Sequence, residues 1–265
     1  MPVCAKKILV ACITLGLSTF AAAQHNTQEQ EWLLLVSPFV WGASLKGDLA
    51  IAGKKADVDM PFADIVSDLD SVFMGNIELT NRRFGAYLDA INVDTSQTEH
   101  VMGQKIKVAV KQTTLAAGAF YRIYTSDLGG STVFNEPRHF TIDPTIGVRW
   151  TKLKASLANT ALGLKFEKKT DWYDPFIGVR ASADLDKHWN ISALADFGGF
   201  DTSNKKTYNG QVYLGYRTFI AQQPTMLRVG YRYLSQRYKT RDFTGNSFNY
   251  DVRQAGPVLG LTVRF

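Results

Sequence analysis

Four arginines recur in a short pattern in the second half of the chain, and their spacing could support electrostatic chemistry. Each arginine follows a glycine by two positions, so the two residues share one face if the segment is a β-strand. The residues on the opposite face are apolar or aromatic. The four copies are Gly147-Val-Arg149, Gly178-Val-Arg180, Gly215-Tyr-Arg217 and Gly230-Tyr-Arg232.

Carboxylates on other segments are available as partners for these arginines. Glu78, Asp89 and Asp196 fall on the polar faces of their own alternating segments. If these faces line the inside of a closed sheet, the charges form an ion-pair network that fills the lumen. The alternative is a constriction that attracts anions, because rings of arginine or lysine can select anions in a pore. The candidate lumen residues are Glu78, Asp89, Arg149, Arg180, Asp196, Arg217 and Arg232.

The segments that carry these residues alternate apolar and polar side chains with a period of two, which predicts β-strands. Ten such segments predict an all-β fold, an antiparallel up-and-down transmembrane β-barrel. Eight or twelve strands are alternatives, because residues 46–59 and 159–169 can be counted in two ways. The predicted strands are residues 32–45, 72–81, 84–95, 104–121, 141–156, 172–185, 189–200, 207–219, 226–238 and 250–265.

The connections between these strands alternate between short turns and longer loops, as in outer-membrane barrels. Residues 96–103 and 239–247 are predicted as loops on the outer side, and residues 125–138 as an unusually long connection on the periplasmic side. A first outer loop extends from residue 47 to about residue 70. Within it, apolar residues at helical spacing predict a short amphipathic helix. These residues are Phe62, Ile65, Val66 and Leu69.

The chain ends on a strongly alternating strand, and its last residue is aromatic. A sheet that closes on itself needs its last strand, since closure removes the exposed edges. This segment therefore predicts the closing strand of an outer-membrane barrel. Its apolar face resembles the signal that the outer-membrane barrel assembly machinery recognises. The residues of this predicted signal are Leu259, Leu261, Val263 and Phe265.

The N-terminus predicts export from the cytoplasm. Lys6 and Lys7 precede a short apolar run, and three alanines ending at Ala23 form a cleavage site, so residues 1–23 are predicted to be a signal peptide. Lipid attachment at Cys12 is a minor alternative. Residues 24–31 are a polar leader and residues 32–265 the barrel. Both cysteines of the chain lie in the signal peptide, which excludes a disulfide framework in the mature protein.

The direction of the two strand faces follows from the cost of charge in lipid. One arginine in mid-bilayer costs about 2–4 kcal/mol. Four of them facing lipid would cost about as much as a typical protein's whole stability, about 5–15 kcal/mol. We therefore expect the arginine face to line the lumen and the apolar face to meet lipid. A soluble lipocalin-like barrel is disfavoured, because its interior should be apolar.

Other classes of function find little support in the sequence. The net charge is +6, with both signs interleaved, so a nucleic-acid-binding surface is not expected. No G-x-S-x-G, H-E-x-x-H or Walker motif occurs, and we predict no enzymatic activity. No cofactor or metal is expected, although the acidic first loop could hold Ca²⁺ as a minor alternative. Aromatic residues near strand ends, including Trp32, Trp41, Trp172 and Tyr173, predict two interfacial girdles.

Several stretches resemble an uncharacterised family of Gram-negative outer-membrane proteins with a β-barrel domain. The resemblance covers nearly the whole mature chain and is most specific from Asp171 onward. It implies a barrel in the outer membrane and no particular activity. The stretches are Ser37-Pro-Phe-Val-Trp41, Phe62-Ala-Asp64-Ile65, Asp171-Trp-Tyr-Asp-Pro-Phe-Ile-Gly-Val-Arg180, Asp196-Phe-Gly-Gly-Phe200, Gly230-Tyr-Arg-Tyr-Leu234 and Gly256-Pro-Val-Leu-Gly-Leu261.

These patterns together predict an integral outer-membrane barrel with a largely filled, arginine-rich lumen and a structural or surface-interaction role. The alternatives are a narrow pore for small, anionic solutes and, more remotely, a lipid-modifying enzyme. The expected partners are outer-membrane lipid, lipopolysaccharide and the barrel assembly machinery, with no nucleic acid. The oligomeric state is left open.

Overall fold

The computed structural model describes residues 32–51, 54–62, 71–101, 104–159, 164–201, 204–241 and 245–265. The predicted signal peptide (residues 1–23) and leader (residues 24–31) lie outside the described residues. Most of the helix predicted in the first loop does too, since Phe62 alone of its four apolar positions is described. The described strands all belong to one compact unit, Glu31–Phe265.

Ten antiparallel strands close into a barrel, as the alternating segments predict. Each strand pairs with its neighbours in the order given below, and β13 pairs with β1 to close the circle. At the seam, Leu34 and Phe265 exchange two backbone hydrogen bonds of 3.0 and 2.9 Å. The barrel strands, in spatial order, are β1 (Leu33–Trp41), β4 (Ser71–Thr80), β5 (Phe84–Val101), β6 (Gln104–Tyr121), β8 (Pro137–Asn159), β9 (Leu164–Asp184), β10 (Trp189–Gly198), β11 (Lys205–Ile220), β12 (Gln223–Arg241) and β13 (Ser247–Arg264).

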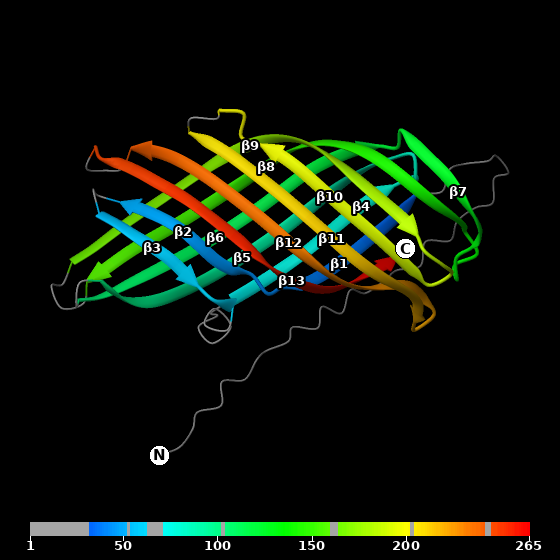
Figure 1. The fold of residues 1–265 in the computed structure, drawn as a ribbon, viewed down its shortest axis with the longest axis horizontal. Coiled ribbons are helices and arrows are strands. Elements are labelled where there is room, and N and C mark those ends of the chain that lie inside the picture. The colour runs from blue at the N-terminus through cyan, green and yellow to red at the C-terminus, as the bar shows by residue number, and fades with distance from the viewer. Residues whose placement is uncertain are drawn as a thin grey trace, which may run out of the picture. The chain divides into compact units, whose positions relative to one another are not determined.

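Three further strands extend this barrel (Figure 1). β2 (Ser44–Ile51) continues the path of β1 along β13, and β3 (Lys54–Met60) pairs with β2. β7 (Tyr124–Ser131) pairs with β8 at the opposite end. β1 and β2 are separated at Gly42, where the strands approach closely: a Cβ on Gly256 would lie 2.0 Å from the Gly42 carbonyl oxygen.

The predicted loops were too long on one side of the barrel. Residues 47–51 and 54–60 were predicted as part of a loop, and they form most of β2 and all of β3 instead. β5 continues to Val101, β12 reaches Arg241, and β8 and β9 form a hairpin up to Asn159 and Leu164. These strands extend past the apolar band, and in β2 Lys46 and Asp48 are exposed while Leu45 and Leu49 are buried. The first strand was predicted to end before residue 47 because Gly47 and Asp48 are residue types common in turns. We call this end of the barrel the hairpin end.

The opposite end, where β1 begins and β13 ends, carries short turns, and we call it the turn end. The turns at residues 81–83, 185–188 and 221–222 are as short as predicted. The exception is the β7–β8 hairpin, which occupies the long connection predicted at residues 125–138. Its five-residue turn, Thr132–Glu136, is named the cap turn below because of where it packs.

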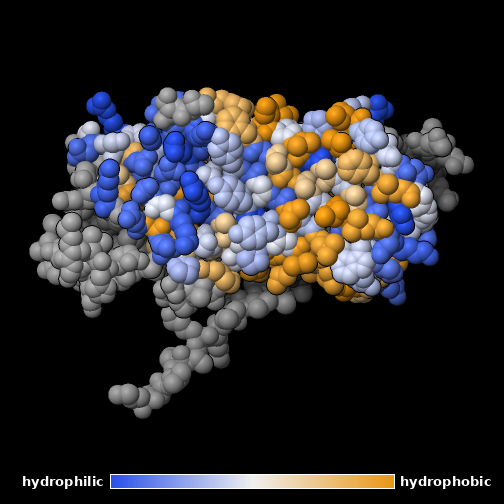
Figure 2. Space-filling model, viewed as in Figure 1, coloured by the Kyte–Doolittle hydropathy of each residue, from blue (hydrophilic) through white to orange (hydrophobic). Residues whose placement is uncertain are grey.

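Apolar side chains gather in a band on the outer surface of the barrel. Figure 2 shows this band between a broad hydrophilic region at the hairpin end and a narrower one at the turn end. Such a band flanked by polar ends is the surface that a lipid bilayer requires of a barrel. No helix of the described residues is long and apolar enough to cross a membrane. Exposed members of the band include Val40, Phe73, Ile77, Ile146, Ile177, Val229 and Leu259.

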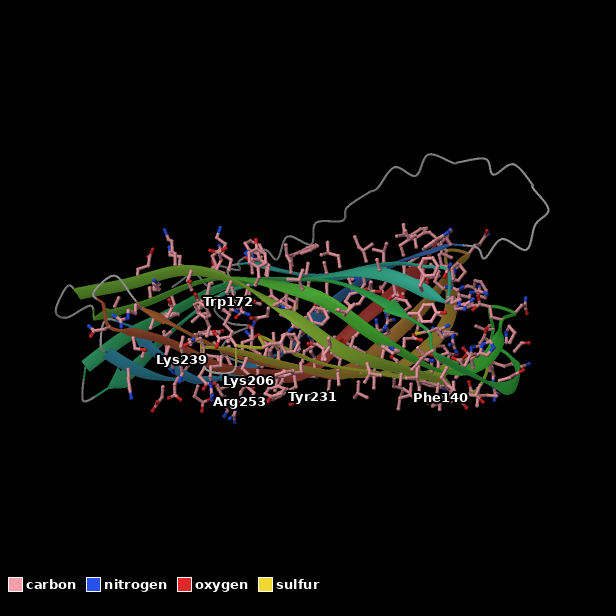
Figure 3. The ribbon with its side chains drawn as sticks, turned by 90° about the horizontal axis from the view of Figure 1, so that it is seen from above. Phe140, Trp172, Lys206, Tyr231, Lys239 and Arg253 are labelled. Carbon is pink, nitrogen blue, oxygen red and sulfur yellow. The ribbon has the colours of Figure 1, made fainter. Side chains whose placement is uncertain are left out.

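The strand face opposite the band points into the barrel, and its side chains fill the interior (Figure 3). Arg149 and Arg232 are buried, while their strand neighbours Val148 and Tyr231 are exposed. β1 differs because both of its faces are apolar. Trp41, predicted to lie in an interfacial girdle, is buried inside the barrel, as is Trp172. Trp41 lies on a strand whose two faces are both apolar, so alternation could not assign it to either side. Trp172 shares the inward face of β9 with Arg180, and this spacing could have placed it in the lumen.

Candidate functional site

The lumen contains a cavity of about 390 Å³ in the half of the barrel near the turn end. We call this part the turn half of the lumen. All seven residues predicted as the lumen charge network line this cavity. The structure therefore brings together side chains from β4, β5, β8, β9, β10, β11 and β12. They are Glu78, Asp89, Arg149, Arg180, Asp196, Arg217 and Arg232.

Two of the ion pairs span the lumen between distant strands. Arg232 on β12 donates two hydrogen bonds to Asp89 on β5, at 3.2 and 2.8 Å. Arg180 on β9 pairs with Glu78 on β4 at 3.0 Å. The bidentate contact between Arg232 and Asp89 fixes the relative orientation of the two groups. These contacts act as braces across the barrel, since their strands are not neighbours in the sheet.

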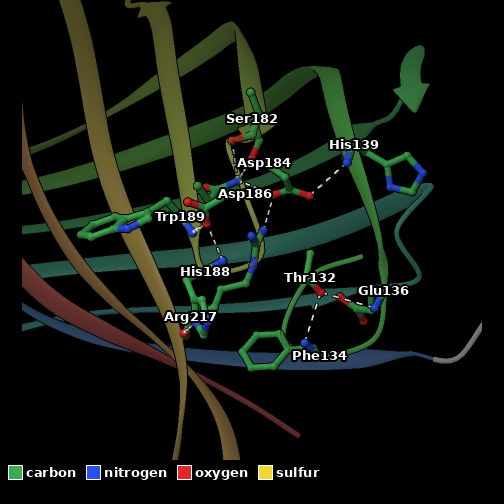
Figure 4. Close-up of polar contacts among 12 residues, drawn as sticks. Thr132, Phe134, Glu136, His139, Ser182, Asp184, Asp186, His188, Trp189 and Arg217 are labelled. Carbon is green, nitrogen blue, oxygen red and sulfur yellow. Dashed lines mark hydrogen bonds and ion pairs between the residues drawn. The ribbon is translucent and has the colours of Figure 1, made fainter. Parts of the chain in front are cut away.

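The other two predicted arginines pair with carboxylates nearer along the sheet. Arg149 contacts Asp196 at 2.8 Å, and both side chains are almost fully buried. Asp196 also accepts a hydrogen bond of 2.6 Å from Asn209. Arg217 pairs with Asp184, a residue that the sequence analysis did not single out (Figure 4). Asp184 lies four positions after Arg180 on the same strand face, and this spacing could have identified it.

Aromatic rings support the guanidinium groups from a second side. Arg180 lies 4.1 Å from the ring centre of Phe120, Arg149 5.0 Å from that of Phe176, and Arg232 5.3 Å from that of Trp41. Cation–π contacts stabilise desolvated charges of this type. These three arginines are thus held between a carboxylate and an aromatic face.

Two glycines of the repeated motif leave space for inward aromatic rings as well as for the arginines. A Cβ on Gly147 would lie 2.4 Å from the ring of Phe176, and one on Gly230 would lie 2.5 Å from the ring of Tyr213. The space beside each of these two glycines is therefore filled by an inward aromatic side chain of the adjacent strand. The other two glycines of the motif face different groups, Gly178 the backbone and side chain of β10 and Gly215 the side chain of Met226.

The sequence analysis also missed Arg228, which lines the same cavity. Its guanidinium carbon lies 4.0 Å from the ring centre of Tyr213, and its Nη1 is 3.5 Å from the hydroxyl of Thr262. No carboxylate of the described residues forms an ion pair with Arg228. Arg228 lies four positions before Arg232 on one strand face, but the glycine follows it rather than precedes it, so the repeat did not reveal it.

The cap turn packs against the rim of the barrel at the turn end. Glu136 accepts hydrogen bonds of 3.0 and 2.6 Å from Arg264 at the end of β13, and it also pairs with Arg82 of the β4–β5 turn. Phe134 packs edge-on against Phe219 of β11. These contacts reach three separate parts of the barrel rim, and Phe134 and Glu136 line the cavity.

Backbone and side-chain hydrogen bonds keep the cap turn in place (Figure 4). The hydroxyl of Thr132 accepts hydrogen bonds from the amides of Phe134 and Glu136, both at 3.3 Å. The Val133 amide donates to the carbonyl of Lys187 in the β9–β10 turn at 2.9 Å. Burial alone would raise the pKa of Glu136. Arg264 lowers this pKa through its hydrogen bonds and its positive charge, and the charge of Arg82 lowers it further, so the pKa lies below its ordinary value.

The lumen towards the hairpin end has a different chemistry, and we call it the hairpin half. Its first layer is a set of neutral hydrogen bonds across the barrel. Gln112 on β6 donates to Gln236 on β12 at 2.9 Å, Gln236 donates to Thr151 at 2.9 Å, and the Tyr250 hydroxyl donates to Gln112 at 2.8 Å. None of these residues lines the cavity. The cavity therefore ends before this layer.

Beyond the neutral layer, a buried apolar cluster fills the hairpin half. Trp172 on β9 stacks on Tyr238 of β12 at 4.4 Å and lies 6.1 Å from Tyr250 of β13, so the cluster crosses the lumen. None of its buried members lines the cavity. The buried members are Leu45, Leu49, Val58, Met60, Val110, Leu153, Trp172, Phe248, Tyr250 and Val252.

The residues predicted as the assembly signal lie on the outward face of β13. Leu259 and Phe265 are exposed, while Leu261 and Val263 are partly buried. They belong to the surface of the barrel and take no part in the lumen. Among the described residues, no group of three or more histidine, cysteine or acidic side chains could hold a metal ion.

Comparison with known proteins identifies the fold. No protein-family model matches the chain. A search of curated proteins found no match either. The solved structure of the outer membrane protease OmpT from Escherichia coli is similar, with 10% sequence identity, a TM-score of 0.55, and 91% of this chain and 99% of that chain covered.

Two further solved structures match less closely in shape. OprG from Pseudomonas aeruginosa has 13% identity and a TM-score of 0.41, covering 88% of this chain and 95% of that chain. Ail from Yersinia pestis has 12% identity and a TM-score of 0.36, covering 88% and 98%. The closed ten-stranded barrel and its similarity to OmpT give this chain the fold of the Gram-negative outer-membrane β-barrel proteins.

Proposed function

We propose that this protein is an integral outer-membrane barrel that does not conduct solutes and that has a structural or surface-interaction role. The apolar band lies in the lipid bilayer. The turn end faces the periplasm and the hairpin end faces outward, because outer-membrane barrels carry short periplasmic turns and longer outer loops. Export would follow signal-peptide cleavage near Ala23.

The closed hairpin half of the lumen is the observation that carries this proposal. An open channel needs a continuous aqueous path, and here a neutral hydrogen-bonded layer and an apolar cluster both cross the barrel. Leu153 and Phe248 in that cluster are completely buried. Hydrophobic constrictions also resist wetting. A ten-stranded barrel is narrow enough for side chains to fill its interior, unlike the wide porins.

A narrow pore for small anions is the second candidate. Among the described residues, eight arginines and six carboxylates line the turn-half cavity, which favours anions over cations there. The two candidates differ over whether the hairpin half opens. We expect no catalytic activity, and a lipid-modifying enzyme stays a remote alternative. Similarity to a protease at 10% identity concerns the fold and transfers no activity.

Lipid, lipopolysaccharide and the barrel assembly machinery are the proposed partners. The apolar band supports the first. Basic residues on the outward faces just beyond the band, such as Lys152, Lys206 and Arg253, support contact with the phosphates of lipopolysaccharide. The exposed apolar residues Leu259 and Phe265 of β13 support recognition by the assembly machinery.

Single-channel recording in a planar bilayer tests the proposal. Refolded protein, checked for folding by its gel mobility with and without boiling, is expected to give no steady conductance. A Phe134→Gly, Glu136→Gly variant, which loosens the cap turn, is expected to stay silent too, because closure resides in the hairpin half.

Steady anion-selective steps from the wild-type protein would overturn the closed-barrel proposal. If an Arg180→Ala, Arg232→Ala variant then reduced the anion preference, the narrow pore would take its place. An Arg253→Ala variant is the matched control, since this arginine lies on the outer surface of the barrel. Recovery of the protein from the soluble periplasm without detergent would contradict the membrane location itself.

A further inference from the structure

We propose that the turn-half cavity is a binding site for a small organic carboxylate, with Arg228 as the group that holds the anion. This inference goes beyond the proposed function, because binding in a pocket closed at one end needs no conduction. Arg228 lines the cavity, and among the described residues it is the cavity arginine that has no carboxylate in ion-pair contact.

The charge of the cavity favours an anion. In the part of the chain that the structure describes, every carboxylate that lines it is already paired with an arginine, and the lining arginines outnumber these carboxylates by eight to six. Several buried guanidinium nitrogens also lack a hydrogen-bond partner within the described residues, namely Nε and Nη1 of Arg149, Nη1 of Arg217 and Nε of Arg232. Desolvated donors of this kind are costly when unsatisfied and leave a positive potential in the cavity.

The position of Arg228 suits a planar anion. Tyr213 covers one face of its guanidinium group, so the ring holds the plane in a fixed orientation. Arg228 is opposite Gly260 in the sheet register, and Gly260 is opposite Phe39 on β1. The edge of a guanidinium group carries paired N–H donors that match the two oxygens of a carboxylate.

The apolar residues that line the cavity favour an organic carboxylate over an inorganic anion. Leu33, Leu35 and Phe39 of β1 face the cavity, and Met226 lies two positions before Arg228 on the same strand face. Ligand sites typically combine an apolar lining with a few placed polar groups, and a cavity of about 390 Å³ is within their usual size range. An inorganic anion such as phosphate would gain nothing from these side chains.

Isothermal titration calorimetry of the refolded full barrel in detergent tests the site, with sodium benzoate as the probe and inorganic phosphate as the second arm. Benzoate is expected to bind with a stoichiometry of one and phosphate much more weakly. Arg228→Gln is expected to weaken benzoate binding by about tenfold or more, since a charge-assisted hydrogen bond is lost. Arg253→Gln is the matched control and is expected to bind as the wild type does.

A second variant tests the cavity without touching any charge. Ser192 lies on the inward face of β10 and lines the cavity, so Ser192→Phe is expected to fill the space and abolish binding while every arginine stays in place. It also provides the test if Arg228→Gln does not fold. Folded wild-type protein that binds no benzoate would overturn the proposal, as would benzoate binding that both variants leave unchanged. Equal affinity for phosphate would overturn the assignment to an organic carboxylate.

Discussion

The two halves of the lumen share β6, β8, β9, β12 and β13 but have opposite chemistry. In the turn half, charged side chains point inward and apolar side chains point outward, as with Arg232 and Tyr231 on β12. In the hairpin half, the same inward face carries apolar residues such as Leu153 on β8 and Val252 on β13, and Arg253 points outward. The strand register does not change between the halves.

The surroundings of the barrel explain this inversion. The turn half lies behind the apolar band, and lipid already satisfies the outward side chains there. Polar residues must therefore face inward and pair with one another. Past the band, the outward side chains are polar and suited to water, so burial of apolar side chains inside stabilises the hairpins as it does in a soluble protein. One barrel thus contains a charged interior where lipid surrounds it and an apolar interior where water surrounds it.

This comparison predicts that the turn half is sensitive to the loss of a charge. Replacement of Asp89 by alanine is expected to lower the free energy of unfolding by about 3–5 kcal/mol, because it leaves the buried Arg232 without its partner. Urea unfolding of the refolded protein in detergent measures the change. An Asp89→Leu, Arg232→Met variant is expected to lose much less. If the double variant were as unstable as the single one, packing rather than charge would govern this half.

The hairpin half is expected to respond to volume instead. Leu153 is completely buried in the apolar cluster, so Leu153→Ala should cost about 3 kcal/mol by removing contacts and leaving a cavity. Leu153→Met keeps the volume and should cost less than about 1.5 kcal/mol. Both are measured by the same unfolding experiment. A loss of less than 1 kcal/mol in the alanine variant would mean that the hairpins contribute little to stability.

The cap turn should give a smaller effect that depends on pH. Its carboxylate is partly exposed, so Glu136→Gln is expected to cost about 1 kcal/mol at neutral pH. Because the folded pKa of Glu136 lies below its ordinary value of 4.5, its contribution is present above about pH 4.5 and is lost as the pH falls through the folded pKa.

The difference in stability between wild type and Glu136→Gln, followed from pH 7 to pH 3, measures this contribution. The two curves should converge as the pH falls. A difference that stays constant over this range would show that the charge of Glu136 does not hold the cap turn in place. Phe134→Ala is a useful companion, since its contact with Phe219 is independent of pH.

The smallest effect is expected at the outward surface of the hairpin end. Lys46 and Asp59 form an ion pair of 3.1 Å across the β2–β3 hairpin, but both side chains are 62% exposed. Exposed pairs are screened by water and salt, so Lys46→Gln should change stability by less than about 1 kcal/mol. A larger loss in the same unfolding measurement would contradict the view that water and salt screen the charges on this surface.

Alternation could predict the ten barrel strands, and the cost of charge in lipid gave the inward direction of the arginines. Glu78, Asp89 and Asp196 could also be assigned to the lumen, since charge facing lipid is too costly. The same reasoning failed where lipid ends. The β2–β3 hairpin was mistaken for a loop because Gly47 and Asp48 are residue types common in turns. β1 carries apolar residues on both faces, so Trp41 was placed on the wrong side.

The tertiary structure decided which groups meet across the barrel. The sequence by itself determined a closed barrel with a charged interior, because period-two alternation and the cost of charge in lipid act strand by strand. The pairing of Arg232 with Asp89, the closure of the hairpin half and the lack of an acidic partner for Arg228 depend on strands far apart in the chain. Local patterns carry no information about such contacts, because barrel closure and strand register set the distances between residues on different strands.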